Sequence, residues 1–347
     1  MKILILGGYG TFGGRVAELL LDRPGLTILI AGRDLSKAKR FCARHNGQAT
    51  LLPVALDRSK IDATLGIDRP DLVVDASGPF QTYGAKRYTV VEACIAHGVD
   101  YLDLADGADF VDGIAEFDAA ARAKGVYVIS GVSSFPVLTA AVLEDISKRM
   151  TIRKVEAGIA PSPHARVGLN VLRAVLSYAG MPVSLKREGN DATGLGLVEV
   201  RRKTVCVSGH LPLPNTRFSL VDVPDLRMLP KKFPDIEEIW MGAGPRPEIL
   251  HWALNKLAWV RARLRLPQLT PLAGICFWVL NRFRFGEHRG GMYVVAKGIR
   301  GKHEAEETWC LLAEEDDGPL IPSMAIEGLV RKLLNGQRPE PGARSEI

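Results

Sequence analysis

The sequence has few cysteines and no long apolar segment. Its five cysteines are far apart and form no Cys-x-x-Cys pair, which argues against a zinc ribbon, a dithiol redox site and a disulfide framework. The longest late apolar run, residues 271–280, has about half of the roughly 20 residues that a membrane-spanning helix needs. Glycines interrupt the apolar run at the N-terminus, so we expect no secretion signal. These features predict a cytoplasmic protein.

Patterns of metal ligands and nucleic-acid-binding motifs are missing as well. No group of His, Cys, Asp and Glu residues has the spacing of a metal site, so we predict no metal. Nothing in the sequence resembles a nucleic-acid-binding module, so no nucleic-acid partner is expected. The chain has 347 residues, of which 47% are hydrophobic and 24% charged. This is enough apolar content for a packed core and enough length for two domains.

Positive charge is concentrated in the second half of the chain. Residues 1–150 contain 17 basic and 18 acidic residues, whereas residues 246–302 contain 11 basic and only 2 acidic ones. In this basic segment Trp252 and Trp259 stand seven residues apart and therefore share one face of a helix. Such a helix fits the core, a dimer interface, a lipid surface or a lipid-like substrate. Peripheral membrane contact stays open as one of these alternatives.

Short apolar runs alternate with helical patterns in the first 130 residues. They predict strands at residues 2–6, 27–31, 50–55, 71–76, 101–104 and 126–130. Continuous apolar strands that alternate with helices indicate βαβ units and a Rossmann-like, doubly wound parallel sheet in an α/β protein. We place this domain at residues 1–135. Longer strand-like runs follow it, and the tail at 337–347 is predicted to be flexible.

A glycine-rich loop follows the first predicted strand. Gly8, Gly10 and Gly13 fit the pattern Gly-x-Gly-x-x-Gly, and a helical pattern begins directly after them. In such a loop the first glycine permits a tight turn, the second a close approach to a pyrophosphate, and the third close packing of helix on strand. The N–H groups at the helix start would bind the phosphates. We therefore predict a dinucleotide site at Gly7, Gly8, Gly10, Thr11, Phe12 and Gly13.

The residue after the second predicted strand indicates which dinucleotide binds. An acidic residue there would bind the free ribose of NAD, but Arg33 stands 20 residues after Gly13. Its guanidinium can bind the 2′-phosphate of NADP through two hydrogen bonds. We predict NADP, with NAD as the alternative. Asp34 would cap the next helix, and Asp57 would lie near the adenine or only cap a helix.

The loop after the fourth predicted strand belongs to the same site. Ligands of parallel sheets collect at the carboxyl ends of the strands. The small residues of this loop would let the backbone pass close to the cofactor, and its aromatic ring would pack on the ribose or the nicotinamide. The residues concerned are Ser77, Gly78, Pro79 and Phe80.

These segments together resemble the saccharopine dehydrogenase-like NAD(P)-binding family. The resemblance is carried by residues 7–14, 31–33, 76–80, 98–103 and 131–136, and by the later segments 222–226, 290–292 and 318–322. It implies a nicotinamide cofactor in the first domain. It also implies a second α/β (α+β) domain over 136–318 for substrate binding and homodimerisation, and a helix at 319–336 that packs back on the first domain. The Cys-Gly-Leu-Asp-Pro-Gly stretch of true saccharopine reductases is absent, so saccharopine itself is not expected as the substrate.

Hydride transfer needs a protein group that exchanges one proton with the substrate. Tyr101 and Asp106 stand at or just past the end of the fifth predicted strand, and Asp103 shares a face with Tyr101. They line the site near the nicotinamide in one interpretation. In the other, the carboxylates only cap the next helix.

A second group of candidates lies beyond the first domain. His164 and Arg166 stand in a proline-rich loop, where they would donate a proton and bind an anionic group, or lie in a solvated turn. His288 and Arg289 precede two glycines and make a similar pair.

Two functions fit these features. The first is an NADP-dependent oxidoreductase that transfers a hydride between nicotinamide and a small-molecule imine, keto or enoyl substrate. The second is a non-catalytic protein that binds NAD(P) as a structural or sensing ligand. A titratable group beside the nicotinamide would favour the enzyme.

Overall fold

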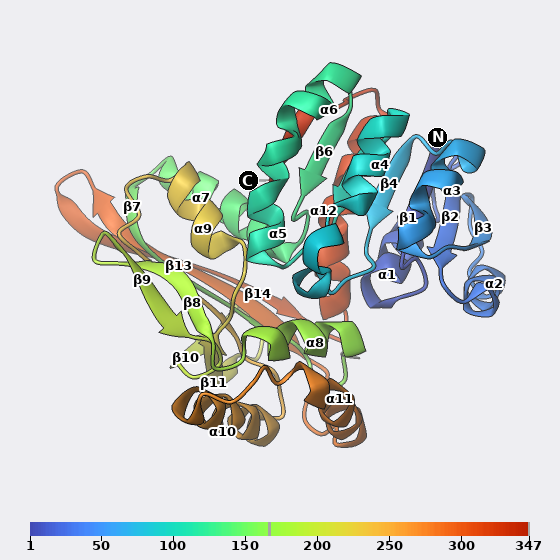
Figure 1. Ribbon diagram of the computed structural model, residues 1–347. Coiled ribbons are helices and arrows are strands. Elements are labelled where there is room, and N and C mark those ends of the chain that lie inside the picture. Colours follow the sequence, from blue (N-terminus) through green and yellow to red (C-terminus); the bar gives the residue numbers. More distant parts are fainter. Residues whose placement is uncertain (166–167, 346–347) are drawn as a thin grey trace. The chain divides into compact units, whose positions relative to one another are not determined.

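The computed structural model describes residues 1–165 and 168–345, which form two compact units (Figure 1). The first unit contains residues 1–137 and the described residues from 319 onward. The second contains the described residues of 138–318.

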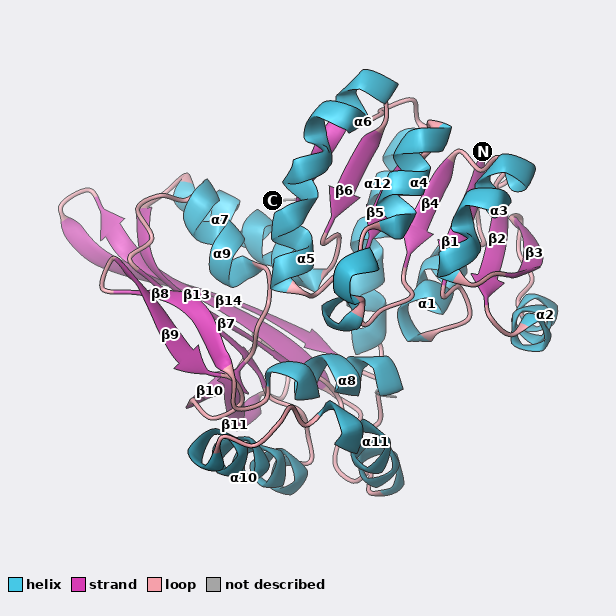
Figure 2. Ribbon diagram, in the orientation of Figure 1, coloured by secondary structure: helices cyan, strands magenta, loops and turns pink. Residues whose placement is uncertain are grey.

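A seven-stranded sheet forms the centre of the first unit, in the order β15-β6-β5-β4-β1-β2-β3. Figure 2 shows β6, β5, β4, β1, β2 and β3 side by side in this order. All of its strand pairs are parallel. From β1 the chain adds β2 and β3 on one side and then β4, β5 and β6 on the other. The strand order therefore reverses between β1 and β4, and doubly wound sheets bind their ligands at this point. The strands are β1 (Lys2–Leu6), β2 (Thr27–Gly32), β3 (Thr50–Ala55), β4 (Leu72–Asp75), β5 (Asp100–Asp103), β6 (Tyr127–Ser130) and β15 (Gly342–Ser345). The helices are α1 (Thr11–Leu19), α2 (Leu35–Arg44), α3 (Ile61–Asp68), α4 (Thr89–His97), α5 (Ala108–Asp112), α6 (Asp118–Lys124) and α12 (Ile321–Leu334).

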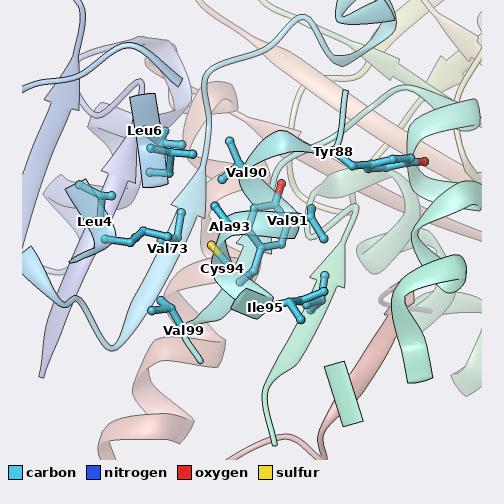
Figure 3. Close-up of a cluster of buried hydrophobic side chains, with 14 of the residues drawn as sticks. Leu4, Leu6, Val73, Tyr88, Val90, Val91, Ala93, Cys94, Ile95 and Val99 are labelled. Carbon is cyan, nitrogen blue, oxygen red and sulfur yellow. The ribbon is translucent and has the colours of Figure 1, made fainter. Parts of the chain in front are cut away.

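Both faces of the sheet are buried at β1, β2, β4, β5 and β6, since successive strand residues point to opposite sides and nearly all of them are buried. The edge strand β3 is partly exposed. Leu4 and Leu6 of β1 belong to one apolar cluster, which also contains Val73 of β4 and Val90 and Cys94 of α4 (Figure 3). Ile3, Ile5 and their neighbours belong to a second cluster on the other face, with side chains of α1 and α12. The continuous apolar runs of the sequence therefore mark strands that are covered by helices on both sides.

The C-terminal segment completes the first unit. In α12, Ile326 and Val330 are fully buried, and the hydroxyl of Ser323 donates a hydrogen bond to the carbonyl oxygen of Phe12 at 3.2 Å. The prediction of a flexible tail at 337–347 is wrong for its described part, since β15 pairs with β6 at the sheet edge. Asp118 accepts a hydrogen bond from the N–H of Ala343 at 2.9 Å. The tail is held by backbone pairing, which its proline and glycine content did not indicate.

The second unit is built on a mixed sheet of six strands in the order β10-β11-β12-β7-β13-β14, together with a separate hairpin of β8 and β9. Its strands are β7 (Thr151–Ala160), β8 (Pro182–Arg187), β9 (Asn190–Leu195), β10 (Val200–Val205), β11 (Leu213–Leu220), β12 (Glu238–Ala243), β13 (Gly290–Arg300) and β14 (His303–Ala313). Its helices are α7 (Thr139–Ser147), α8 (Leu169–Tyr178), α9 (Asp225–Lys232), α10 (Glu248–Leu264) and α11 (Ala273–Arg282). No helix in the described part of the chain is long and apolar enough to span a bilayer.

Candidate active site

The glycine loop between β1 and α1 is packed so tightly that three of its positions exclude a side chain. Gly7 has a φ of +74°, which favours glycine, and a Cβ there would lie 2.7 Å from the carbonyl oxygen of Ala76. A Cβ on Gly13 would lie 2.4 Å from the carbonyl oxygen of Gly7. The tight turn is thus at Gly7 and not, as expected, at Gly8. Gly8 instead permits close approach of β1 and β2, since its Cβ would lie 2.9 Å from the carbonyl oxygen of Ile5 and 3.1 Å from the Cα of Ile30.

The start of α1 offers N–H groups to a ligand. Gly10 is the N-cap and is exposed, so no side chain accepts a hydrogen bond from the helix start, and the first turn contains no acidic residue. The first four N–H groups of an α-helix have no partner within the helix and carry partial positive charge. Thr11 and Phe12 lie in this turn and are half-buried. The donor set and the bare backbone around it fit a diphosphate.

Arg33 lies at the end of β2 and presents its guanidinium to solvent. It is exposed and has no hydrogen bond or ion pair with any residue that the structure describes. Asp34 caps α2 by accepting a hydrogen bond from the N–H of Lys37 at 3.1 Å. Asp57 likewise accepts from the N–H of Ser59 at 3.0 Å, and hydrogen bonds from Ser59, followed by the positive charge of Arg33, lower the pKa of Asp57. Both carboxylates therefore have capping roles, and Arg33 is the cation available to a ligand.

Tyr9, which the sequence did not indicate, joins the glycine loop to this corner of the sheet. Its hydroxyl accepts a hydrogen bond from the N–H of Asp34 at 3.0 Å. Its ring lies so close to β2 that a Cβ on Gly32 would be 2.5 Å from the ring. The glycine loop from Gly7 to Gly13, which we call the glycine cradle, and Arg33 are consequently held at one edge of the sheet.

A buried ion pair supports the loop after β4. Asp75 is fully buried, and its Oδ1 accepts hydrogen bonds from the N–H and the hydroxyl of Ser77, at 2.9 and 2.5 Å. Its Oδ2 lies 3.7 Å from the guanidinium of Arg58, which stacks on the ring of Tyr83 at 3.7 Å and donates to the carbonyl oxygen of Arg87 at 3.0 Å. This network, of which the sequence predicted only Ser77, fixes the loop at the carboxyl edge of the sheet.

Two predicted site residues lie in the core instead. Phe80 is 5% exposed, and its ring packs on those of Tyr83 and Phe110, with centroids 5.6 and 4.9 Å apart. Tyr101 is fully buried in the same cluster, where burial and then the nearby Asp103 raise the pKa of the phenol well above its usual value. These buried positions do not favour the predicted contact of Phe80 with the cofactor or the predicted proton donation by Tyr101.

Asp103 has a structural position. Its Oδ1 accepts three hydrogen bonds, from the N–H groups of Ala105 and Gly131 at 2.9 and 2.8 Å and from the hydroxyl of Ser130 at 3.0 Å. It is fully buried, and burial raises its pKa to about 7. The carboxyl group ties the end of β5 to the end of β6.

Asp106 remains at the carboxyl edge of the sheet, where a nicotinamide would lie. It is half-buried and accepts a hydrogen bond from the Nε2 of Gln81 at 2.9 Å, and burial raises its pKa. The Oε1 of Gln81 is buried and has no hydrogen-bond partner among the described residues. Gly78 and Pro79, in the same loop as Gln81, are half-buried. The hydrogen bond between Gln81 and Asp106 thus joins the loops after β4 and β5.

The structure brings together two histidines that the sequence placed in separate loops. The rings of His164 and His288 are stacked, with centroids 3.7 Å apart. The Nδ1 of His288 lies 2.5 Å from the Oδ2 of Asp316, and the hydroxyl of Ser162 donates to the Oδ1 of Asp316 at 2.5 Å. A carboxylate that accepts from Nδ1 leaves Nε2 of the same ring to exchange a proton. Sequence reasoning missed Asp316 and Ser162, which carry no local motif.

The other candidates of the second unit do not join this cluster. Arg166 lies outside the described residues. Arg289 donates hydrogen bonds to the carbonyl oxygens of Leu211 and Pro212 and pairs with Glu287, so it holds a turn. Among the residues that the structure describes, no group of three or more His, Cys, Asp or Glu side chains could hold a metal ion.

Comparisons with known proteins bear on this arrangement. Residues 3–129 match the family model of the saccharopine dehydrogenase NADP binding domain. The chain is similar in structure to apo histidine-tagged saccharopine dehydrogenase (L-Glu forming) from Saccharomyces cerevisiae, with 12% identity, a TM-score of 0.64, and coverage of 99% of this chain and 94% of that chain. It is also similar to amine dehydrogenase from Mycobacterium smegmatis, with 12% identity, a TM-score of 0.50, and coverage of 99% and 94%. The comparison with curated proteins finds no match.

These findings confirm the family resemblance, the fold class and NADP as the cofactor. The likeness to the two solved structures is a likeness of fold, because identity is low. The family match also confirms the prediction of an NAD(P)-dependent oxidoreductase.

Proposed function

We propose that this chain, an NAD(P)-dependent oxidoreductase whose first unit is an NADP-binding domain of the saccharopine dehydrogenase type, transfers a hydride between NADP and the carbon of a C=N bond. The observation that carries the proposal is the glycine cradle, where Cβ atoms on Gly7 and Gly13 would meet backbone oxygens at 2.7 and 2.4 Å. An amine dehydrogenase among the proteins with this fold favours a C=N bond, with keto and enoyl compounds as the alternative substrates.

Three groups of residues would hold the cofactor. The loop from Gly7 to Gly13 would bind the diphosphate through backbone N–H groups, and Arg33 would bind the 2′-phosphate. Gln81 would bind the carboxamide of the nicotinamide, because its buried Oε1 lacks a donor among the described residues. NADPH supplies the hydride when it is bound, and NADP+ accepts it in the reverse reaction.

Asp106 would supply the proton. It lies in the same unit as the cradle, and its raised pKa lets it keep a proton at a higher pH than an ordinary carboxyl group. The hydrogen bond from Gln81 fixes its orientation. His288, oriented by Asp316, is the second candidate, favoured by its open Nε2.

The cofactor site is tested by calorimetric titration of the folded protein with NADPH and NADH. Gly13→Ala forces α1 away from the turn, so it should weaken both coenzymes by about tenfold or more, in line with a lost charge-assisted hydrogen bond. Gly66→Ala is the matched control, because a Cβ on this helical glycine meets only the ring of His97 at 3.7 Å. Absence of heat with either coenzyme would overturn the proposal.

The proton donor is tested by oxidation of a panel of primary and secondary amines with NADP, followed by NADPH absorbance. Asp106→Asn should lower kcat by roughly 100-fold or more and leave the Kd of NADPH unchanged, because general acid–base catalysis contributes factors of that size. If Asp106→Asn retains full kcat and His288→Gln loses it, the imidazole is the donor. The homodimer expected from the family resemblance stays a prediction, which light scattering tests.

A further inference from the structure

Helix α10 buries two polar side chains and exposes several large apolar ones. Its buried residues are His251, Asn255 and Ala258. The side chain of His251 hydrogen bonds with the hydroxyl of Ser219 at 2.7 Å, and Asn255 donates to a carbonyl oxygen at 2.8 Å. Trp252 is 50% exposed. Burial of apolar surface is favourable, so a helix with this orientation needs an apolar partner on its outer face.

Exposed apolar side chains are concentrated in this part of the chain. Of the 17 large hydrophobic side chains that are exposed among the described residues, ten lie between residues 249 and 285. They come from α10, α11 and the segments that follow each helix, and Figure 1 shows both helices on the same side of the second unit. We call them the α10–α11 patch: Ile249, Trp252, Trp259, Leu264, Leu266, Ile275, Phe277, Trp278, Phe283 and Phe285.

The charge around the patch is mainly positive, although Glu248 stands before its first residue and Glu287 after its last. Residues 256–284 contain six basic residues and no acidic one. None of the six forms an ion pair with any residue in the described part of the chain. Lys256 lies between the two tryptophans of α10, 5.6 Å from the ring of Trp252 and 5.9 Å from that of Trp259. Arg263, Arg265 and others are exposed at the end of the same helix.

We propose that the α10–α11 patch binds the surface of an anionic lipid bilayer. Tryptophan is favoured at the boundary between headgroups and acyl chains, and exposed arginines beside it gain from negative lipid charge. The patch is apolar and its surroundings are mainly positive, and an anionic bilayer offers the apolar phase and the negative charge that complement them. A second copy of the chain fits less well, because a two-fold interface would bring like-charged patches together. The inference is independent of the proposed function, since the cradle lies in the first unit.

The test is flotation of the full-length protein with vesicles of phosphatidylcholine, with and without phosphatidylserine. We expect binding only to the vesicles with phosphatidylserine, a blue shift of tryptophan emission, and loss of binding as salt rises. The triple variant Arg263→Glu, Arg265→Glu and Arg282→Glu should weaken partitioning by on the order of 100-fold, since each basic residue contributes about a fivefold factor. The double variant Trp252→Ser and Trp278→Ser should weaken it by about tenfold or more.

Matched controls use exposed residues of the first unit. Lys39→Glu, Arg40→Glu and Arg44→Glu reverse three charges on α2, and Ile67→Glu changes a side chain that is 81% exposed. These variants should bind vesicles like the unchanged protein. Unaltered circular dichroism and NADPH binding would show that each variant is folded.

Two results would overturn the proposal. The first is no binding of the folded protein to phosphatidylserine vesicles at low salt. The second is a dimer in light scattering that Trp278→Glu dissociates, which would assign the patch to a second copy of the chain.

Discussion

Replacement of Asp103 by asparagine should lower the free energy of unfolding at pH 4 and raise it at pH 8. The wild-type carboxyl group is fully buried and its pKa is raised to about 7, whereas an unfolded aspartate has a pKa of 3.8. Between these values the folded state holds a proton that the unfolded state has lost. The free energy of unfolding therefore falls as pH rises from 4 to 7 and changes little above pH 7.

The size of the effect follows from the shift and from the hydrogen bonds. A shift of one unit corresponds to about 1.4 kcal/mol, so the wild type loses about 4 kcal/mol of stability across this range. The amide of Asp103→Asn would keep an acceptor for Ala105, Ser130 and Gly131 and would carry no charge. Its NH2 group would place two unpaired N–H donors where the protonated wild-type carboxyl group has one unpaired O–H at Oδ2, so the variant has one more unpaired donor. An unpaired buried donor costs about 1–3 kcal/mol. The variant should be less stable than wild type at pH 4 by that amount, and more stable at pH 8 by about 1–3 kcal/mol.

The assay must report on the first unit alone. All five tryptophans lie between residues 240 and 309, in the second unit, so tryptophan fluorescence does not follow the first. Amide hydrogen exchange of peptides from β5 and β6, measured in urea and corrected for intrinsic exchange at each pH, gives the local free energy of unfolding. Asp103→Ala, which loses all three hydrogen bonds, should be less stable at both pH values. Equal destabilisation by Asp103→Asn at pH 4 and pH 8 would refute the reasoning, because it would mean that the buried group is charged throughout.

Three further predictions follow from single residues. Arg33→Ala should weaken NADPH by about 10–100-fold, the value of a charged hydrogen bond, and leave NADH unchanged in calorimetry; equal losses for both coenzymes would contradict the 2′-phosphate assignment. Tyr101→Phe should keep kcat within about twofold, because the phenol is buried in the core; a large loss of kcat in steady-state assays would return Tyr101 to the site. Asp225→Asn should abolish a fall in stability between pH 4 and 7 in the second unit, because burial raises the pKa of Asp225 to about 7. Urea titrations followed by tryptophan fluorescence test this, and an unchanged pH dependence would argue against it.

The sequence by itself determined the first six strands of the first unit and its cofactor. Apolar runs predicted β1 to β6, because most of these strands are buried on both faces and need apolar residues at nearly every position. The edge strand β3, which is partly exposed, is the exception. The spacing of Gly8, Gly10 and Gly13 predicted the cradle, since these constraints act between near neighbours in the chain. Where the turn falls was less well determined, because the choice between Gly7 and Gly8 depends on contacts with β2 and with the loop after β4.

Only the tertiary structure decided which polar groups meet and which are buried. Tyr101 and Asp106 stand five residues apart, yet one lies in the core and the other at the sheet edge, because α4 covers the face of β5 that carries Tyr101. His164 and His288 come together with Asp316 through loops that are distant in sequence. The outward face of α10 is likewise set by which side of the helix the second sheet covers. Long-range packing fixes these pairings, and no local pattern of residues encodes it.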